Sequence, residues 1–435
     1  MKLLKLKSVS NVITGFPFKG NEYTDRGVRT VRGENVTEGR LRWDSTKHWN
    51  QPFDKFEEYS LKADDIVVGM DGSKVGKNKA RIFEKDLPLL LAQRVACIRA
   101  KKGTDQVFLY YCINNNRFED YVYRIQTGSA VPHISKTQIE EYSIPAFDLD
   151  TQKKLSKTLS DLDRKIEINN KINTKLEAMA KLIYEYWFVQ FDFPDAKGKP
   201  YKSSGGKMVY NEALKYEIPE GWEAKELASI LKCNYSSIGK NGSFDVIEYL
   251  DTGSLTKNVV KGTERIYPLE DKVPSRAKRI VGKDDILYST VRPNLCHYGI
   301  IKKPLHNMVA STGFAQLASR IGWISNDLIY TFLTSPWVTS KLHQIATLSV
   351  SAYPSISPNN ILELNIALPK DKKFFEPINL MFATIYSKIS LNQQENIELS
   401  ALRDWLLPML MNGQVTVKGT HHSKKGKLKH GSAIL

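Results

Sequence analysis

The chain has 435 residues, more than one compact core normally holds, so two or three domains are expected. Hydrophobic residues make up 41% and charged residues 25% of the sequence, and no apolar run reaches the roughly 18 residues of a membrane-spanning helix, which excludes a membrane-spanning helical protein. Lysine and arginine number 63 against 47 aspartates and glutamates, and the net charge of +16 favours a polyanionic partner such as nucleic acid.

The N-terminus and the cysteines indicate the compartment. Lysines alternate with leucines near the start of the chain, so the continuous apolar stretch of a secretory signal is missing there. The four cysteines are widely spaced, without histidines at ligand spacing, which argues against structural zinc and against a disulfide framework. They are Cys97, Cys112, Cys233 and Cys296. We expect a cytosolic protein without a metal site.

Periodicity divides the sequence into two mixed α/β segments, each followed by a long helix. The segments are 1–148 (first mixed domain), 149–190 (first long helix), 191–222 (turn-rich connector), 223–370 (second mixed domain), 371–413 (second long helix) and 414–435 (tail). The tail carries lysines and histidines but no acidic residue, and we expect it to be disordered and solvated.

The second half of the chain repeats the first after about 220 residues. Motifs that recur in the same order are KADDIVV (62–68) and GKDDILY (282–288), SAVPHIS (129–135) and SAYPSIS (351–357), and the strand ends IP (144–145) and LP (368–369). Three such pairs in one order indicate a duplicated domain.

Both long helices carry a heptad seam, in which apolar residues recur in alternating steps of three and four. The first seam is Leu155, Leu159, Leu162, Ile166, Asn169, Asn173, Leu176, Ala180, Ile183 and Trp187. The second is Ile378, Phe382, Ile385, Ile389, Asn392, Asn396, Leu399, Arg403, Leu406 and Leu410. Such seams need a partner helix, and we expect the two helices to cover one another.

Asparagines occupy the midpoint of each seam. If the helices pair antiparallel and centred, Asn169 and Asn173 lie opposite Asn392 and Asn396, so that the amides bond one another. A slipped register would set an amide against leucine or isoleucine, so these residues are predicted to fix the register. The seam is about 50 Å long at ~1.5 Å per residue, which makes a rigid spacer. The predicted fold class is therefore α+β, with two pseudo-symmetric mixed α/β domains separated by a long antiparallel two-helix coiled coil.

Beside the first seam, Ile168, Ile172 and Met179 widen the apolar stripe beyond what a two-helix contact needs. Surplus apolar width on a helix indicates that a further protein packs there.

Motifs of known active sites are missing. The nearest approach to a phosphate-binding loop is GSKVGKN at 72–78, which is one residue short and has Asn78 where a hydroxyl would bind Mg²⁺. A dinucleotide or S-adenosylmethionine fingerprint is absent, and Pro194-Asp195 with Lys197 and Lys199 lacks the second acid of a nuclease motif. We expect a binding protein that has neither a catalytic site nor a cofactor.

Several strings resemble the specificity (S) subunits of type I restriction-modification systems, over nearly the whole chain. They are GFPFK (15–19), LIYEYWF (182–188), FDFP (191–194), GKPYKSSGGKM (198–208), IPEGW (218–222) and LLPMLMNG (406–413). The basic tail beyond Gly419 has no counterpart in this pattern.

The resemblance implies a division of labour. Segments 1–148 and 223–370 would be target-recognition domains that each read half of a split double-stranded DNA site, and the helices would fix the gap between the halves. Two methyltransferase subunits would bind along the helices, and motor-nuclease restriction subunits would complete the complex. S-adenosylmethionine, ATP and Mg²⁺ would belong to these partners.

Candidate DNA contacts are cationic, amide and aromatic side chains on turn-rich segments, because Arg and Asn suit guanine and adenine edges and Lys meets phosphate. In the first domain they are Arg26, Arg29, Arg32, Arg40, Arg42, Lys74, Lys77 and Lys79. In the second they are Tyr288, Arg292, Asn294 and Tyr353. Since these loops differ between the halves, two unlike half-sites are expected.

Two alternatives stay open from the residues alone. One is a self-contained restriction endonuclease or nuclease with an unfamiliar active site, which metal-dependent cleavage by the isolated chain would reveal. The other is an RNA-binding or scaffolding protein, which a preference for RNA over duplex DNA would reveal.

Overall fold

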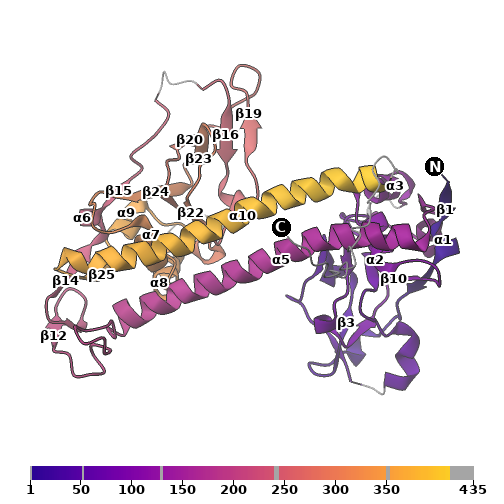
Figure 1. Cartoon of the computed structure of the whole chain (residues 1–435), viewed down its shortest axis with the longest axis horizontal. Coiled ribbons are helices and arrows are strands. Elements are labelled where there is room, and N and C mark those ends of the chain that lie inside the picture. The colour runs from indigo at the N-terminus through magenta and orange to yellow at the C-terminus, as the bar shows by residue number, and fades with distance from the viewer. Residues whose placement is uncertain (1, 51–52, 128–130, 240–243, 349–352, 412–435) are drawn as a thin grey trace, which may run out of the picture. The chain divides into compact units, whose positions relative to one another are not determined.

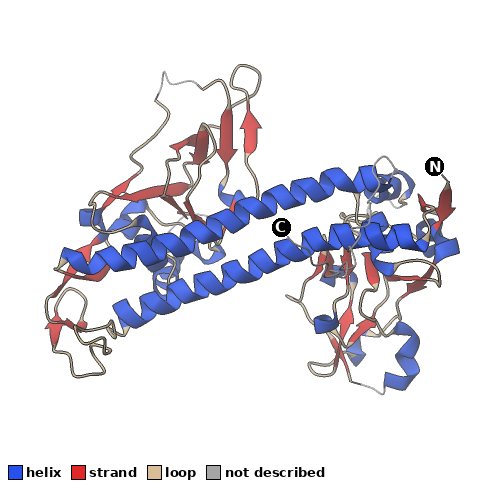
Figure 2. Cartoon of the chain, viewed as in Figure 1, coloured by secondary structure: helices blue, strands red, loops and turns tan. Residues whose placement is uncertain are grey.

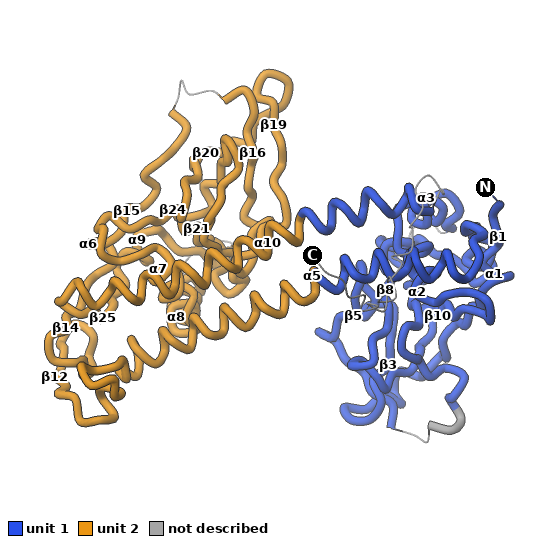
Figure 3. The backbone as a smooth tube through the Cα atoms, viewed as in Figure 1, with its two compact units in different colours: residues 1–165, 398–435 blue, residues 166–397 orange. Residues whose placement is uncertain are grey.

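The structure is a computed structural model that describes residues 2–50, 53–127, 131–239, 244–348 and 353–411 (Figure 1). The chain divides into two compact units, which are residues 1–165 with 398–435 (unit 1) and residues 166–397 (unit 2) (Figure 3). The predicted tail, 414–435, lies outside the described residues. Each unit contains one mixed domain and a part of each long helix.

The main sheet of unit 1 has apolar cores on both faces. Along β7 (Ile66–Gly69), Ile66 and Val68 belong to one core and Val67 to the other. Neighbouring side chains of a strand point to opposite faces, and burial of both faces explains why this strand is apolar throughout. The antiparallel sheet consists, in order, of β2 (Ser10–Thr14), β10 (Val95–Ala100), β7 and β8 (Lys79–Arg81).

Smaller sheets and short helices complete the mixed domain of unit 1. A three-stranded sheet contains β6 (His48–Trp49), β3 (Val28–Val31) and β9 (Leu89–Leu91), with β3 and β9 parallel. Two-stranded pairs are β1 (Leu3–Lys5) with β11 (Ser143–Pro145) and β4 (Val36–Thr37) with β5 (Arg40–Leu41). The helices are α1 (Leu6–Val9), α2 (Gln106–Ile113), α3 (Asn116–Ile125), α4 (Lys136–Glu140), η1 (Gly20–Glu22), η2 (Gly33–Asn35), η3 (Phe53–Tyr59) and η4 (Glu84–Asp86).

Unit 2 repeats most of these elements in the same order, with a fourth strand, β20 (Ala277–Ile280), in its second sheet. Its first sheet contains β15 (Leu231–Cys233), β24 (Phe314–Ser319), β21 (Asp285–Ser289) and β22 (Tyr298–Ile301). Its second contains β19 (Glu264–Ile266), β16 (Ile247–Leu250), β23 (Met308–Ser311) and β20 (Ala277–Ile280), with β16 and β23 parallel. The pairs are β14 (Trp222–Glu226) with β25 (Asn365–Pro369) and β17 (Leu255–Thr256) with β18 (Val259–Val260). The helices are α6 (Leu227–Ile230), α7 (Asn326–Leu333), α8 (Pro336–Thr347), α9 (Pro358–Leu362), η6 (Thr252–Ser254), η7 (Pro293–Leu295) and η8 (Lys372–Phe374).

The repeated sequence motifs form the same local structures in both units. Asp65 and Asp285 each accept a hydrogen bond at 2.7 Å from the backbone N–H three residues earlier, and each follows an aspartate in the left-handed conformation. Ser135 and Ser357 each cap a short helix, with a glutamine or asparagine side chain closing the capping box. The duplication predicted from the sequence is therefore present in the fold.

The two long helices are α5 (Leu149–Tyr184) and α10 (Phe375–Met411), drawn in blue with the other helices in Figure 2. The expected helix over 149–190 is not uniform, because its last turn, Glu185–Val189, is π-helical. In this turn the ring of Phe188 stacks on Tyr184 with centroids 5.1 Å apart, and both rings are buried in the core of unit 2. None of the described helices is long and apolar enough to cross a bilayer.

The connector forms a small aromatic lobe of unit 2. Its hairpin consists of β12 (Met208–Asn211) and β13 (Tyr216–Pro219). Phe193 stacks on both Tyr201 and Trp222, with centroids 4.8 and 5.2 Å apart. The connector is thereby packed onto the start of the second mixed domain.

Candidate nucleic-acid interface

Three loops of unit 1 are joined through their backbones: the loop after β7, the turn between β9 and β10, and the loop before α4. The Met70 N–H donates to the Arg94 carbonyl at 2.9 Å, and the Ile134 N–H donates to the Met70 carbonyl at 2.9 Å. The Gly72 N–H donates to the Pro132 carbonyl at 3.0 Å. We call these three loops the loop framework; its bonds hold surface loops that would otherwise move independently.

Unit 2 has the same loop framework with the same bonds. The Thr290 N–H donates to the Gly313 carbonyl at 2.9 Å, and the Ile356 N–H donates to the Thr290 carbonyl at 2.8 Å. The Arg292 N–H donates to the Pro354 carbonyl at 2.8 Å. The two units therefore carry equivalent backbone scaffolds on which different side chains stand.

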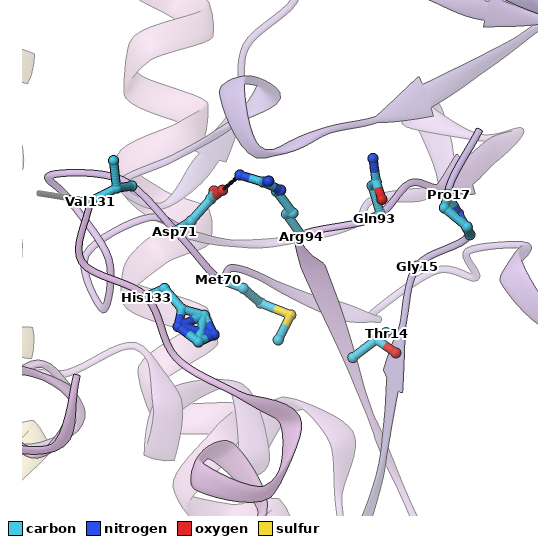
Figure 4. A pocket seen from close by; sticks show the side chains of 9 residues that line it. All are labelled: Thr14, Gly15, Pro17, Met70, Asp71, Gln93, Arg94, Val131 and His133. Carbon is cyan, nitrogen blue, oxygen red and sulfur yellow. Dashed lines mark hydrogen bonds and ion pairs between the residues drawn. The ribbon is translucent and has the colours of Figure 1, made fainter. Parts of the chain in front are cut away.

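The framework of unit 1 lines a pocket of about 590 Å³ (Figure 4). Its lining residues are Thr14, Gly15, Pro17, Met70, Asp71, Gln93, Arg94, Val131 and His133. The Arg94 guanidinium donates from Nη1 to Asp71 Oδ2 at 2.7 Å, yet the arginine side chain is 70% exposed. Asp71 is in turn bridged through its backbone to His133. The pocket thus combines a cation, a carboxylate, an amide and an imidazole.

The framework of unit 2 presents a different group. Arg292 is in the left-handed conformation, with φ 47°, and its guanidinium lies 4.9 Å from the centroid of the Tyr353 ring. Arg292, Asn294 and Tyr353 are all exposed. Three of the four residues predicted for this domain therefore lie on surface loops.

The long helices contact one another through their asparagines within unit 2. The Asn392 amide donates to Asn173 Oδ1 at 2.8 Å, and the Asn169 amide donates to Asn396 Oδ1 at 2.9 Å. Residue numbers rise along one helix as they fall along the other, so the two segments run antiparallel. Within unit 1, the same two helices contact one another through Arg403, whose Nη1 donates to Asp163 Oδ1 at 2.8 Å.

Comparisons with known proteins show which proteins the chain resembles. A family model described as "Type I restriction modification DNA specificity domain" matches residues 1–178. The type I restriction enzyme MjaIX specificity subunit of Methanocaldococcus jannaschii is 24% identical over 338 residues, which cover 76% of this chain and 74% of that protein. The type I restriction enzyme HindI specificity subunit of Haemophilus influenzae is 22% identical over 358 residues, covering 71% and 77%. The first 178 residues therefore match the specificity-domain model, and about three quarters of the chain is similar to a named type I specificity subunit.

A solved structure of the family shares the fold. The crystal structure of the S subunit of a type I restriction-modification system from M. genitalium covers 94% of this chain and 96% of its own, with a TM-score of 0.55 and 17% identity. The predicted fold class is thereby confirmed. The relatives are named specificity subunits, so the prediction of a non-catalytic component agrees with the family.

The five arginines predicted for the first domain differ in how accessible they are to a DNA partner. Arg26 and Arg40 are exposed, and no ion pair joins them to another described side chain. Arg29 is half-buried, with its guanidinium 4.5 Å from the Trp43 ring centroid and a hydrogen bond of 2.6 Å to the Asp86 carbonyl.

The other two arginines have acidic neighbours. Arg32 pairs with Glu34 at 2.9 Å, and Arg42 pairs with Asp44 at 3.4 Å. These ion pairs are largely solvent-accessible, and pairs of that kind contribute little to stability. The guanidinium groups can therefore exchange a carboxylate for a phosphate at small cost.

The predicted lysines separate into two groups. Lys74 is exposed and pairs with Glu38 at 2.9 Å, and Lys77 is exposed as well. Lys79 is only 1% exposed; its ammonium donates to the Gly76 carbonyl at 2.9 Å and to Glu119 Oε1 at 2.6 Å. Burial lowers the pKa of Lys79, although the hydrogen bond to Glu119 opposes that effect. The predicted DNA contact of Lys79 is therefore corrected: it fastens the β7–β8 loop to α3.

Tyr288 is corrected in the same way. It is 1% exposed, and its ring stacks on Tyr298 with centroids 5.5 Å apart inside the core of unit 2. Burial raises the pKa of Tyr288 to about 12. Tyr288 lies on β21, which is buried along its whole length, so DNA cannot reach its side chain.

Four polar groups of the pocket escaped the sequence-based prediction: Asp71, Gln93, Arg94 and His133. Gln93 and Arg94 lie in a turn and Asp71 and His133 in a β-bridge; His133 belongs to the repeated string SAVPHIS, but none of the four belongs to a motif of known binding chemistry. The three hydrogen bonds of the loop framework identify them, because those bonds join loops far apart in the chain. Among the residues described, no group of three or more His, Cys, Asp or Glu side chains is arranged to hold a metal ion.

Proposed function

We propose that this specificity subunit reads a split, asymmetric DNA site, with residues 1–148 and 223–370 acting as two target-recognition domains. One observation carries the proposal: both units have the same loop framework, but it presents Arg94 in one and Arg292 in the other. Equivalent scaffolds would dock on duplex DNA in equivalent ways, and unlike side chains would read unlike bases. The net charge of +16 supports a polyanionic partner.

Cationic, amide and aromatic side chains that are exposed or only partly buried supply the phosphate and base contacts. In the first domain we assign this role to Arg26, Arg29, Arg32, Arg40, Arg42, Lys74 and Lys77. In the second we assign it to Arg292, Asn294 and Tyr353. Lysines are expected to contribute salt-dependent affinity, whereas arginine and asparagine contribute base discrimination.

The long helices serve as the spacer between the two domains. α5 has 36 residues and α10 has 37, so each is about 55 Å long at ~1.5 Å per residue. The paired asparagines Asn169, Asn173, Asn392 and Asn396 hold the register of the helix pair. A fixed register implies a fixed number of base pairs between the half-sites.

Exposed apolar side chains on α5 support docking of partner subunits. The row follows helical spacing and consists of Ile168, Ile172, Met179 and Leu182 on α5 and Tyr186 in the π-helical turn that follows it; all are between 37% and 65% exposed. Apolar rows of this kind on a helix mark protein interfaces. We assign this row to a methyltransferase subunit, with two such subunits and motor-nuclease restriction subunits forming the whole complex. S-adenosylmethionine, ATP and Mg²⁺ are then held by those partners, in the cytoplasm of a prokaryotic cell.

The test is competition binding with the complex of this subunit and its methyltransferase. A labelled duplex library is selected at moderate salt, about 150 mM, and the bound fraction is sequenced. We expect one motif of two unlike halves separated by a fixed gap. Binding that random duplex competes away without enrichment of any sequence would contradict the proposal. Cleavage by the isolated chain with added Mg²⁺ would favour a nuclease instead.

A further inference from the structure

At two equivalent positions, one loop framework has an arginine where the other has a glycine. The hydrogen bond from Met70 to the Arg94 carbonyl matches the one from Thr290 to the Gly313 carbonyl, so Arg94 and Gly313 are equivalent. Each of these two residues also directly precedes a six-residue strand, β10 or β24.

The second exchange runs in the opposite direction. The bond from Gly72 to the Pro132 carbonyl matches the bond from Arg292 to the Pro354 carbonyl, so Gly72 and Arg292 are equivalent. Each framework thus carries one arginine at these two positions. In unit 1 it is Arg94, on the turn between β9 and β10, and in unit 2 it is Arg292, on the loop after β21.

Both arginines are held in an uncommon backbone conformation. Arg94 has φ 64° and Arg292 has φ 47°, in the left-handed region that residues other than glycine, asparagine and aspartate seldom adopt. Glycine would fit either position more easily, as Gly72 with φ 97° illustrates. Non-glycine residues kept in strained conformations cluster at functional sites.

Both arginines are also oriented by a neighbour. Asp71 holds Nη1 of Arg94 at 2.7 Å, and the ring of Tyr353 lies under the guanidinium of Arg292. The remaining nitrogens of Arg94 form no hydrogen bond with the described residues, and the side chain stays 70% exposed. A restrained guanidinium with free donors suits two-point recognition, because less side-chain entropy is lost on binding.

The position of Arg94 in unit 1 corresponds to Gly313 in unit 2, where there is little space for a side chain. A Cβ atom on Gly313 would lie 2.8 Å from Cγ2 of Thr252. The residue beside Arg94 is Gln93, which lines the same pocket and is exposed; its backbone N–H donates to the Phe16 carbonyl at 2.8 Å, and its side-chain amide makes no hydrogen bond with the described residues. Its counterpart directly before Gly313 is the shorter Thr312.

We infer that Arg94 is the specificity-determining residue of the first half-site, held in position by Asp71 and assisted by Gln93, and that it does there what Arg292 does for the second half-site. This inference rests on the proposed function. Arginine pairs in two-point fashion with the O6 and N7 acceptors of guanine, and glutamine with N6 and N7 of adenine. Arg94 therefore controls one base pair in one half of the DNA site, which predicts a guanine there.

For the test, the full chain is expressed with its methyltransferase in a host that has no other modification of the same bases. The modified bases of the host genome are then sequenced. The matched variants are Arg94→Gly and Arg292→Gly, because each copies the residue that the other framework already has and relieves a left-handed arginine. We expect Arg94→Gly to relax one position in one half-site, with discrimination falling about 5- to 150-fold, the range of one two-point contact. Arg292→Gly is expected to relax a position in the other half-site only.

Two further variants separate recognition from charge and folding. Arg94→Lys keeps the charge without the planar fork, and we expect it to relax the same position while DNA affinity is retained. Asp71→Asn removes the ion pair and is expected to relax that position partially. Thermal melting of each variant checks that the fold is intact. An unchanged motif in Arg94→Gly, or relaxation of both halves together, would overturn the inference while the proposed function stands. A wild-type protein without any two-part motif would overturn both.

Discussion

The side-chain amide of Asn392 donates a hydrogen bond to the side-chain oxygen of Asn173 at 2.8 Å, and both side chains are buried between α5 and α10. One turn away, Asn169 bonds both Asn396 and Glu395. Amides are thus paired with amides at the middle of an otherwise apolar seam. Polar residues in such seams select one register at a cost in stability.

Leucine at Asn173 alone should destabilise the helix pair. The variant leaves the amide of Asn392 buried without its partner, which costs about 1–3 kcal/mol of unfolding free energy. Replacing Asn173 and Asn392 together removes both polar groups, so the double variant should be markedly more stable than the sum of the two single variants. Denaturant unfolding of the four proteins in a double-mutant cycle measures the difference. Additive losses would show that the two amides are not coupled.

Leucine at all four asparagines should loosen the gap between half-sites without lowering stability. A uniformly apolar seam no longer penalises a slipped register, so modified motifs with altered gaps are expected beside the original one. Modified-base sequencing counts the gap lengths. The single exposed substitution Lys175→Ala on α5 serves as control. If the quadruple variant keeps one gap length, the asparagines do not set the register.

Lys79 and Lys77 should behave differently although they are two residues apart. Lys79→Ala removes a buried ammonium that bonds Glu119, and we expect a loss of about 1–3 kcal/mol in unfolding free energy. Lys77→Ala should leave stability unchanged but weaken DNA binding and reduce its salt dependence by about one unit of log–log slope. Thermal melts and binding titrations over salt test both. Equal stability of the two variants would contradict the structural role of Lys79.

Glu177 should make stability depend on pH in an unusual direction. Burial raises its pKa, with Lys181 and Lys257 opposing the effect. A group whose pKa is higher in the folded state contributes stability below its unfolded pKa, about 4.3 for glutamate, and loses that contribution as pH rises through the folded value. Glu177→Gln should therefore be more stable than the wild type at pH 7 and no more stable at pH 3.5. Glu167→Gln, exposed on the same helix and paired with Lys171 at 2.8 Å, is the control and should not gain stability at pH 7.

The apolar row on α5 should be needed for assembly. Ile172→Asp introduces a charge at an exposed position, so the fold should be unaffected while the complex with the methyltransferase weakens at least ten-fold, or about 1.4 kcal/mol. Size-exclusion chromatography and titration with the purified methyltransferase measure the effect, with Lys175→Ala as matched control. Full affinity of Ile172→Asp would place the partner elsewhere.

The architecture could be predicted well because it depends on periodic patterns in the sequence. The heptad seams gave the pairing of α5 with α10, and the recurring SAVPHIS and SAYPSIS strings gave the duplicated domain. Both signals extend over many residues, so single deviations such as the π-helical turn after Tyr184 do not disturb them.

The site was predicted less well, because the exposure of a side chain to a DNA partner depends on packing between residues far apart in the sequence. Lys79 stands in a basic, glycine-rich stretch next to two exposed lysines, and only the approach of Glu119 from α3 reveals that it is buried. Tyr288 is the penultimate residue of β21, a strand that is packed against apolar cores on both faces. Arg94 was missed because its equivalence to Gly313 depends on a backbone hydrogen bond between loops 24 residues apart in sequence.

The central claim is that two related domains with unlike loops read two unlike half-sites at a fixed separation. Modified-base sequencing of a host with and without the gene, in the presence of its methyltransferase, tests it most directly. We predict one asymmetric two-part motif, with an invariant gap, that is modified only when the gene is present. A continuous motif, a gap of variable length, or a pattern of modification that is the same without the gene would contradict the account.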